Sequence, residues 1–236
     1  SINAPITHTA SSSDKINVEL TIELIGIPDE SDYIIKGSST ETSLNFLKSG
    51  KISPQSNIKI KIAADNPIGD AIRIIEEKIS WEIKFYNTTM SLGDTGAHRI
   101  YTTVGTPNIV APSGASIPNV PRMDMSVPII SSAISSSGTS TNYTKIIWDV
   151  VKANGDYYLG VSLSDTEAWN LPSLPNGADC LSISKFVRNV CMAIGIPGGF
   201  TAQYYAAYYR TPVDPESPKK AIAGLSLNNP NIHPGD

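Results

Sequence analysis

The sequence is poor in the residues from which metal and phosphate sites are built. Among its 236 residues it has two cysteines and three histidines, and these are too scattered to match the ligand spacing of a known metal motif. It also lacks the GxxxxGK[ST] loop that cradles nucleotide phosphates. We therefore predict no metal site, and nothing in the sequence calls for a cofactor.

Positive charge and long apolar runs are scarce as well. Lysine and arginine number 18 against 22 acidic residues, the formal net charge is −4, and no basic stripe is present, which argues against a nucleic-acid partner. No apolar run approaches the roughly 20 residues of a membrane-spanning helix. The many Ser, Thr and Asn residues favour a secreted or cell-surface protein, and the first residues indicate that any signal peptide is absent or already removed.

The first 105 residues are dominated by patterns typical of β-strands. Polar and apolar residues alternate with period two, between loops rich in Ser, Asn, Gly and Pro. The predicted strands lie at residues 15–27, 57–64, 78–86 and 99–104. Several short strands that each have one apolar face predict an immunoglobulin-like β-sandwich domain over residues 1–105.

Residues 106–236 have a different composition and form the second predicted domain. Residues 106–124 are rich in proline and small residues, which predicts a linker or an extended arm, and the serine-rich residues 131–142 predict a loop. The next segment, TNYTKIIWDVVKANG, predicts a helix with Thr141 or Asn142 as its N-cap.

The clearest helical pattern runs from residue 180 to residue 194. Asp179 is the predicted N-cap, apolar residues follow at helical spacing, and Gly195 ends the helix. Cys180 and Cys191 would lie roughly 16 Å apart along this helix. Because a disulfide needs Cα atoms within about 7 Å of each other, both cysteines are predicted to be free thiols. Strands are predicted beyond the helix, at 200–210 and 221–227.

This helix and its flanks carry a family resemblance. A cysteine in the first turn, an apolar stripe and the sequence AIGIPGG before an aromatic strand resemble the core of transglutaminase-like proteins among the papain-like cysteine enzymes. The approach loop, with Trp169 and LPNGADC, is similar to that of bacterial members. The match covers about 30 residues and includes Asp179, Cys180, Leu181, Phe186, Val187, Ile194, Gly195, Ile196 and Pro197. The resemblance implies an α+β transglutaminase-like domain over residues 106–236, incomplete at its C-terminal end if the chain continues further.

The position of Cys180 also suits a nucleophile on physical grounds. A helix N-terminus presents a positive dipole end and unpaired backbone N–H groups, which favour a thiolate and stabilise an oxyanion. The alternative is that Cys180 is a small buried apolar residue, as free cysteines often are. Cys191, in the last turn, is predicted to be a core residue.

A nucleophilic cysteine also needs a base. Of the three histidines, His233 is the one that follows Cys180 in the order that the resemblance implies. The resemblance implies a histidine that opens a strand and an aspartate partner from the following strand. The context of His233, NNPNIHPGD, is instead that of a turn, and Asp236 is too close in the sequence to be that partner. Either the triad is completed beyond residue 236, or the fold persists without chemistry and His233 is a surface residue.

Two residues near Cys180 are candidates for substrate binding. Trp169 could cover the acyl site, or it could anchor a loop, and Asp179 directly precedes the thiol. The first functional hypothesis is cysteine acyl transfer or amide and peptide hydrolysis through a Cys180 thioester, with a protein or peptide substrate. The alternative is a non-catalytic binding or structural surface protein that has a degenerate transglutaminase-like scaffold.

Overall fold

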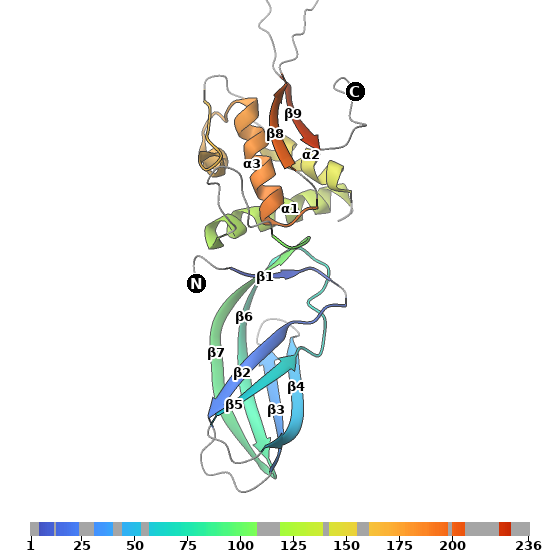
Figure 1. Ribbon diagram of the computed structural model, residues 1–236, viewed down its shortest axis with the longest axis vertical. Coiled ribbons are helices and arrows are strands. Elements are labelled where there is room, and N and C mark those ends of the chain that lie inside the picture. Colours follow the sequence, from blue (N-terminus) through green and yellow to red (C-terminus); the bar gives the residue numbers. More distant parts are fainter. Residues whose placement is uncertain are drawn as a thin grey trace, which may run out of the picture. The chain divides into compact units, whose positions relative to one another are not determined.

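The computed structural model describes residues 5–11, 13–23, 31–39, 44–52, 57–107, 119–138, 142–154, 161–197, 200–205 and 222–227. The chain divides into two compact units (Figure 1). The first, here called the β unit, is Ile6–Thr102. The second, the helical unit, comprises Ser1–Pro5 and Thr103–Asp236.

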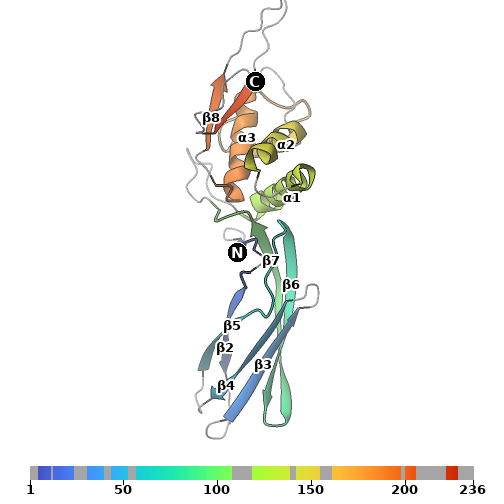
Figure 2. The same cartoon turned by 90° about the vertical axis from the view of Figure 1, so that its right-hand side faces the viewer.

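A five-stranded mixed sheet curves into a half-barrel in the β unit. Its spatial order is β1-β7-β6-β3-β4, and β2 pairs with β5 as a separate two-stranded antiparallel sheet (Figure 2). The strand bounds are β1 (Ile6–Thr9), β2 (Asn17–Glu23), β3 (Ser31–Ser39), β4 (Asn45–Ile52), β5 (Asn57–Ala63), β6 (Ile74–Phe85) and β7 (Thr88–Thr103).

The predicted immunoglobulin-like β-sandwich is therefore wrong, although all four predicted strands are present as β2, β5, β6 and the end of β7. Alternation shows which residues face the core, but it does not show how a sheet closes. The pairing of β6 with β7 shifts register between Lys78 and Ser80 and again between Trp81 and Glu82. Such bulges bend and twist a strand pair, which favours a curved sheet over two flat layers.

Apolar side chains on alternate residues fill the core of the β unit. In β6 the buried positions recur with period two, and Ile83 on β6 and Ile35 on β3 have no exposed surface. Ile60 and Ile62 of β5 close the same cluster from the two-stranded sheet. Among the described residues of this unit, the carboxylate of Glu77 is also buried, and it accepts a hydrogen bond from the Ser39 hydroxyl.

The second unit is mainly helical, so the predicted α+β transglutaminase-like domain is also corrected. Its elements are α1 (Val120–Ser137), α2 (Tyr143–Asn154), the 3-10 helix η2 (Glu167–Ser173), α3 (Cys180–Ala193), and the antiparallel strands β8 (Phe200–Tyr205) and β9 (Ile222–Leu227). The helix predicted after Asn142 is confirmed as α2. The Lys145 amide donates to Asn142 Oδ1 at 3.1 Å, so Asn142 is its N-cap.

Helix α1 occupies residues that composition assigned to an extended arm and a serine-rich loop. The Arg122 amide donates to Asn119 Oδ1 at 3.1 Å, and Pro121 lies in the first turn, where proline is tolerated. Met123, Val127 and Ile130 are fully or almost fully buried. This helical spacing of apolar residues outweighs the loop-like composition.

Candidate functional site

The start of α3 forms as the sequence predicts. The Ser182 amide donates to Asp179 Oδ1 at 2.7 Å, so Asp179 caps the helix and Cys180 is its first residue. At the other end Gly195 has φ +70°, a conformation that suits glycine. The Ile194 carbonyl accepts from the amides of Val104 and Gly105 at 3.0 and 3.2 Å, which fixes the helix end.

The thiol of Cys180 is buried, with 2% of the residue exposed. Burial raises its pKa, and the negative charge of Asp179 raises it further. The backbone N–H groups of Leu181 and Cys180 act in the opposite direction and lower it, but their effect is smaller. The thiolate-favouring effect expected of the helix N-terminus is therefore present but outweighed in this structure.

Asp179 is held as an anion beside this thiol. Burial by itself would raise the pKa of Asp179, but hydrogen bonds from the side chain and backbone of Ser182, another from Ser162 and the charge of Lys185 together lower it. A carboxylate that is occupied as a helix cap has less freedom to bind a substrate. Its predicted substrate-binding role stays a prediction.

Cys191 differs from Cys180 in its surroundings. It has no exposed surface, and burial raises its pKa to about 12. Both cysteines are free thiols, as the helical spacing predicts. Cys191 is confirmed as a core residue.

Trp169 lies in η2 and has 8% of its surface exposed. The Arg122 guanidinium carbon of α1 is 5.1 Å from the centroid of its ring, a cation–π distance. The indole Nε1 has no hydrogen-bond partner among the residues that the structure describes. These contacts fit an anchor between η2 and α1, and the role of Trp169 in substrate binding stays a prediction.

A buried charged cluster that sequence reasoning missed ties the segment before η2 to α3. Arg188 Nη2 lies 2.9 Å from Asp165 Oδ1, and both side chains are largely buried. Asn189 donates from Nδ2 to the Asp165 carbonyl at 2.8 Å and accepts from Arg188 at Oδ1. In the sequence Arg188 and Asn189 lie between the apolar positions of the helix, so the helical pattern gave no sign that they are buried.

A second set of hydrogen bonds joins the same segment to the first turns of α3. The Leu163 amide donates to Ser182 Oγ at 2.7 Å, and Lys185 Nζ donates to the Leu163 carbonyl at 2.8 Å. The Asp179 amide donates to the Val161 carbonyl at 2.8 Å. These contacts fix the backbone that leads to Cys180.

The predicted base is not brought to the thiol within the described residues. His233 lies outside them. His8 and His98 belong to β1 and β7 of the other unit, and the described part of the helical unit contains no histidine. Of the strand predicted at 200–210, residues 200–205 form β8, and residues 206–210 lie outside the described residues.

Neither a metal cluster nor a membrane span is found in the part of the chain that the structure describes. No group of three or more His, Cys, Asp or Glu side chains there could hold a metal ion. No helix among the same residues is both long enough and apolar enough to cross a membrane.

No protein-family model, curated protein or solved structure matches this chain. The comparisons therefore assign neither a family nor a site. The candidate site rests on the geometry at the start of α3.

Proposed function

We propose that the helical unit carries out cysteine-dependent acyl transfer or amide hydrolysis of the transglutaminase-like type, with a protein or peptide amide as substrate. The observation that carries this proposal is the position of Cys180. It is the first residue of a capped helix, and the backbone N–H groups of Cys180 and Leu181 act on its thiol. Such groups stabilise both a thiolate and the oxyanion of an acyl intermediate.

The reaction follows from this arrangement. A base takes the proton of Cys180, and the sulfur attacks the carbonyl carbon of a carboxamide or peptide bond. The tetrahedral intermediate collapses to a thioester when the base returns the proton to the leaving ammonia or amine. An acceptor amine or water then attacks the thioester, and the thiol is regenerated with its proton. The sequence-predicted base is His233.

The described geometry sets a condition on this proposal. Burial and the Asp179 carboxylate raise the pKa of Cys180, so the thiol is protonated at neutral pH in this conformation. Catalysis then requires both a base that accepts the proton and an opening that admits the substrate.

Alkylation of the folded full chain by iodoacetamide over a range of pH tests the proposal. Mass spectrometry would follow Cys180, with Cys180→Ala as control and Cys191 as an internal buried reference. The proposal expects Cys180 to react in the folded state, with a pKa below the free-thiol value of about 8.5. It also expects His233→Ala to remove that low pKa. A Cys180 thiol that reacts only after denaturation contradicts it.

The burial of Cys180 favours a second candidate, a non-catalytic binding or structural protein in which this thiol is part of the core. The same alkylation experiment separates the two candidates. Equal protection of Cys180 and Cys191 in the folded chain supports the second.

A further inference from the structure

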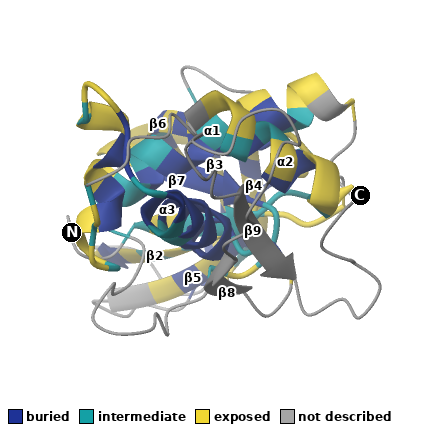
Figure 3. Cartoon of the chain, turned by 90° about the horizontal axis from the view of Figure 1, so that it is seen from above, coloured by how far each residue is buried: buried dark blue, intermediate teal, exposed yellow. Residues whose placement is uncertain are grey.

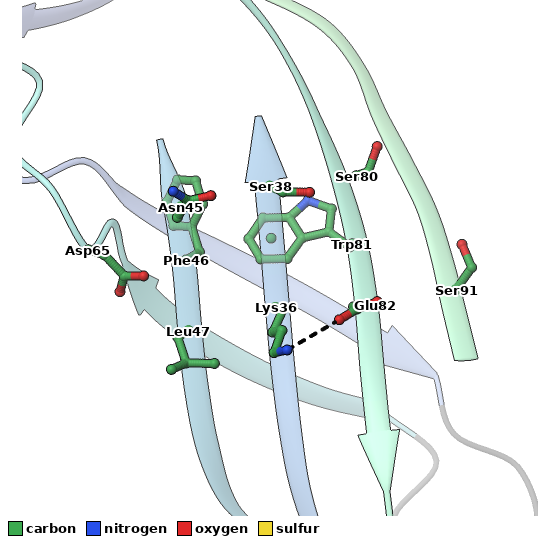
Figure 4. Close-up of a pocket in the computed structure, with 11 residues that line it drawn as sticks. Lys36, Ser38, Asn45, Phe46, Leu47, Asp65, Ser80, Trp81, Glu82 and Ser91 are labelled. Carbon is green, nitrogen blue, oxygen red and sulfur yellow. Dashed lines mark ion pairs between the residues drawn. The ribbon is translucent and has the colours of Figure 1, made fainter. Parts of the chain in front are cut away.

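A hollow of about 460 Å³ lies in the β unit over β3, β4 and β6 (Figure 4). Small-molecule sites commonly have volumes of about 300 to 1,000 Å³. In the figure Leu47 and Asp65 lie on one side of the hollow, and Ser80 and Ser91 lie on the other. None of these residues takes part in the site at Cys180.

The backbone of Gly37 forms part of the floor of the hollow and lies directly against Trp81. A Cβ atom at this position would lie 2.5 Å from the ring of Trp81 on the neighbouring strand. Trp81 is 5% exposed, and its ring centroid is 5.3 Å from that of Phe46. The two rings thus pack on the core side of β3, while Lys36 and Ser38 alternate with Gly37 and are exposed.

The walls offer hydrogen-bonding groups of both kinds and one apolar surface. The hydroxyls of Ser38 and Ser91 and the amide of Asn45 can donate and accept, and the carboxylate of Asp65 accepts. All four side chains are exposed. Leu47, which is 54% exposed, supplies an apolar wall.

The charges of the lining disfavour an anionic ligand. Lys36 Nζ lies 3.8 Å from Glu82 Oε1, so the one lysine of the lining is paired with a carboxylate. The carboxylate of Asp65 adds a second negative charge. Phosphate or sulfate groups would therefore meet net negative charge in this hollow.

We propose that this hollow binds a neutral polyhydroxylated ligand, a saccharide unit of a glycan. The apolar face of the sugar ring packs on Leu47, and its hydroxyls exchange hydrogen bonds with Ser38, Asn45 and Asp65. A hydroxyl both donates and accepts, which matches this mixture of groups. The proposal concerns the β unit and does not depend on the chemistry of Cys180.

Saturation-transfer NMR on the full chain tests the proposal, with neutral tetrasaccharides built from glucose, mannose, galactose and N-acetylglucosamine as probes. We expect at least one to bind with a Kd of about 1 mM or tighter. Ser38→Arg fills the hollow with a long side chain and should weaken binding about tenfold or more. Ser49→Arg, an exposed Ser→Arg change on β4 outside the hollow, should change the Kd by less than about twofold.

Three results would overturn the proposal: no binding by any of these probes up to about 10 mM, equal effects of the two Ser→Arg changes, or tighter binding of a sulfated tetrasaccharide or an uncharged peptide than of every neutral sugar. Thermal unfolding of both variants shows that they are folded. If Ser38→Arg is unfolded, Asp65→Ala on the Leu47 side of the hollow replaces it, with the same tenfold weakening expected.

Discussion

The β unit and the helical unit bury different kinds of side chain. The β unit packs isoleucine and aromatic residues from alternate strand positions, and its ion pairs lie at the surface. In the helical unit, α3 buries Ser182, Arg188 and Asn189 together with its apolar residues, and Figure 3 shows nearly the whole helix in the colour of buried residues. Buried polar groups need partners in fixed directions, whereas apolar groups need only volume. Directional hydrogen bonds therefore fix the approach to Cys180, whereas the core of the half-barrel is held mainly by apolar packing.

The largest expected effect is that of Arg188→Ala. It leaves the largely buried Asp165 carboxylate without its ion pair and Asn189 without its donor, and should lower the free energy of unfolding by about 3 kcal/mol. Urea unfolding monitored by circular dichroism measures this loss. A loss below about 1 kcal/mol would show that the buried cluster does not hold the helical unit together.

A smaller loss should follow from Gly37→Ala in the β unit. The added methyl group overlaps the buried ring of Trp81, so the ring has to move, and overpacking of this kind costs about 2 kcal/mol. The same unfolding experiment and the tryptophan fluorescence spectrum would report it. Unchanged stability would mean that the Trp81 ring has room to shift away from the added methyl group.

Asp179→Ala should cost about 1 kcal/mol, because it removes the N-cap of α3. The folded-state pKa of Asp179 is lowered, so this contribution is fully present above the ordinary aspartate pKa and is lost as the pH falls below it. The difference in stability between the two proteins should therefore shrink in acid. A constant difference from neutral pH to strongly acidic pH would contradict the assignment.

Asp179→Asn separates the cap from the charge. Asparagine also caps helices well, so stability should change little. The pKa of Cys180 should fall, because the carboxylate that raises it is gone. The ultraviolet absorbance of the thiolate, titrated against the Cys180→Ala protein, measures this shift, and an unchanged titration would show that burial alone sets the pKa.

The smallest effect is expected for Lys145→Ala. Its ion pair with Asp149, one turn further along α2, has N···O 2.8 Å, but the lysine is well exposed. Such pairs contribute about 0.3 to 0.5 kcal/mol and are weakened by salt. This variant is the surface control for Arg188→Ala, and a loss as large as that of Arg188→Ala would remove the contrast between buried and exposed pairs.

Local pattern predicted much of the secondary structure and little of its assembly. The caps Asn142 and Asp179 follow from short-range rules, and so do the strands β2, β5, β6 and the end of β7, whereas β1, β3 and β4 were not predicted. The closure of the sheet depends on bulges in β6 and β7, which period-two alternation does not reveal. Helix α1 is not predicted, because its proline and serine content is typical of a loop and obscures the apolar spacing of Met123, Val127 and Ile130.

The candidate site was predictable in part for a related reason. The place of Cys180 in its helix is a local property. Its raised pKa depends on burial by residues that are distant in the sequence, and the pair Asp165–Arg188 joins segments whose contact no local pattern shows. Contacts between segments that are distant in the sequence are thus the part of the site that local patterns do not predict.

The meeting of Gly105 and Gly195 also has a consequence for the order of folding. A side chain on either glycine would overlap the backbone carbonyl of the other, so the two segments approach closely at the end of α3. Helix α3 can form early from its local cap, but this contact has to close a loop that contains α1, α2 and η2. Closing so long a loop costs chain entropy before the contact can stabilise the fold. The contact between Gly105 and Gly195 should therefore form late in refolding and open early in unfolding. Hydrogen exchange should accordingly be faster at the amides of Val104 and Gly105 than in the middle of α3.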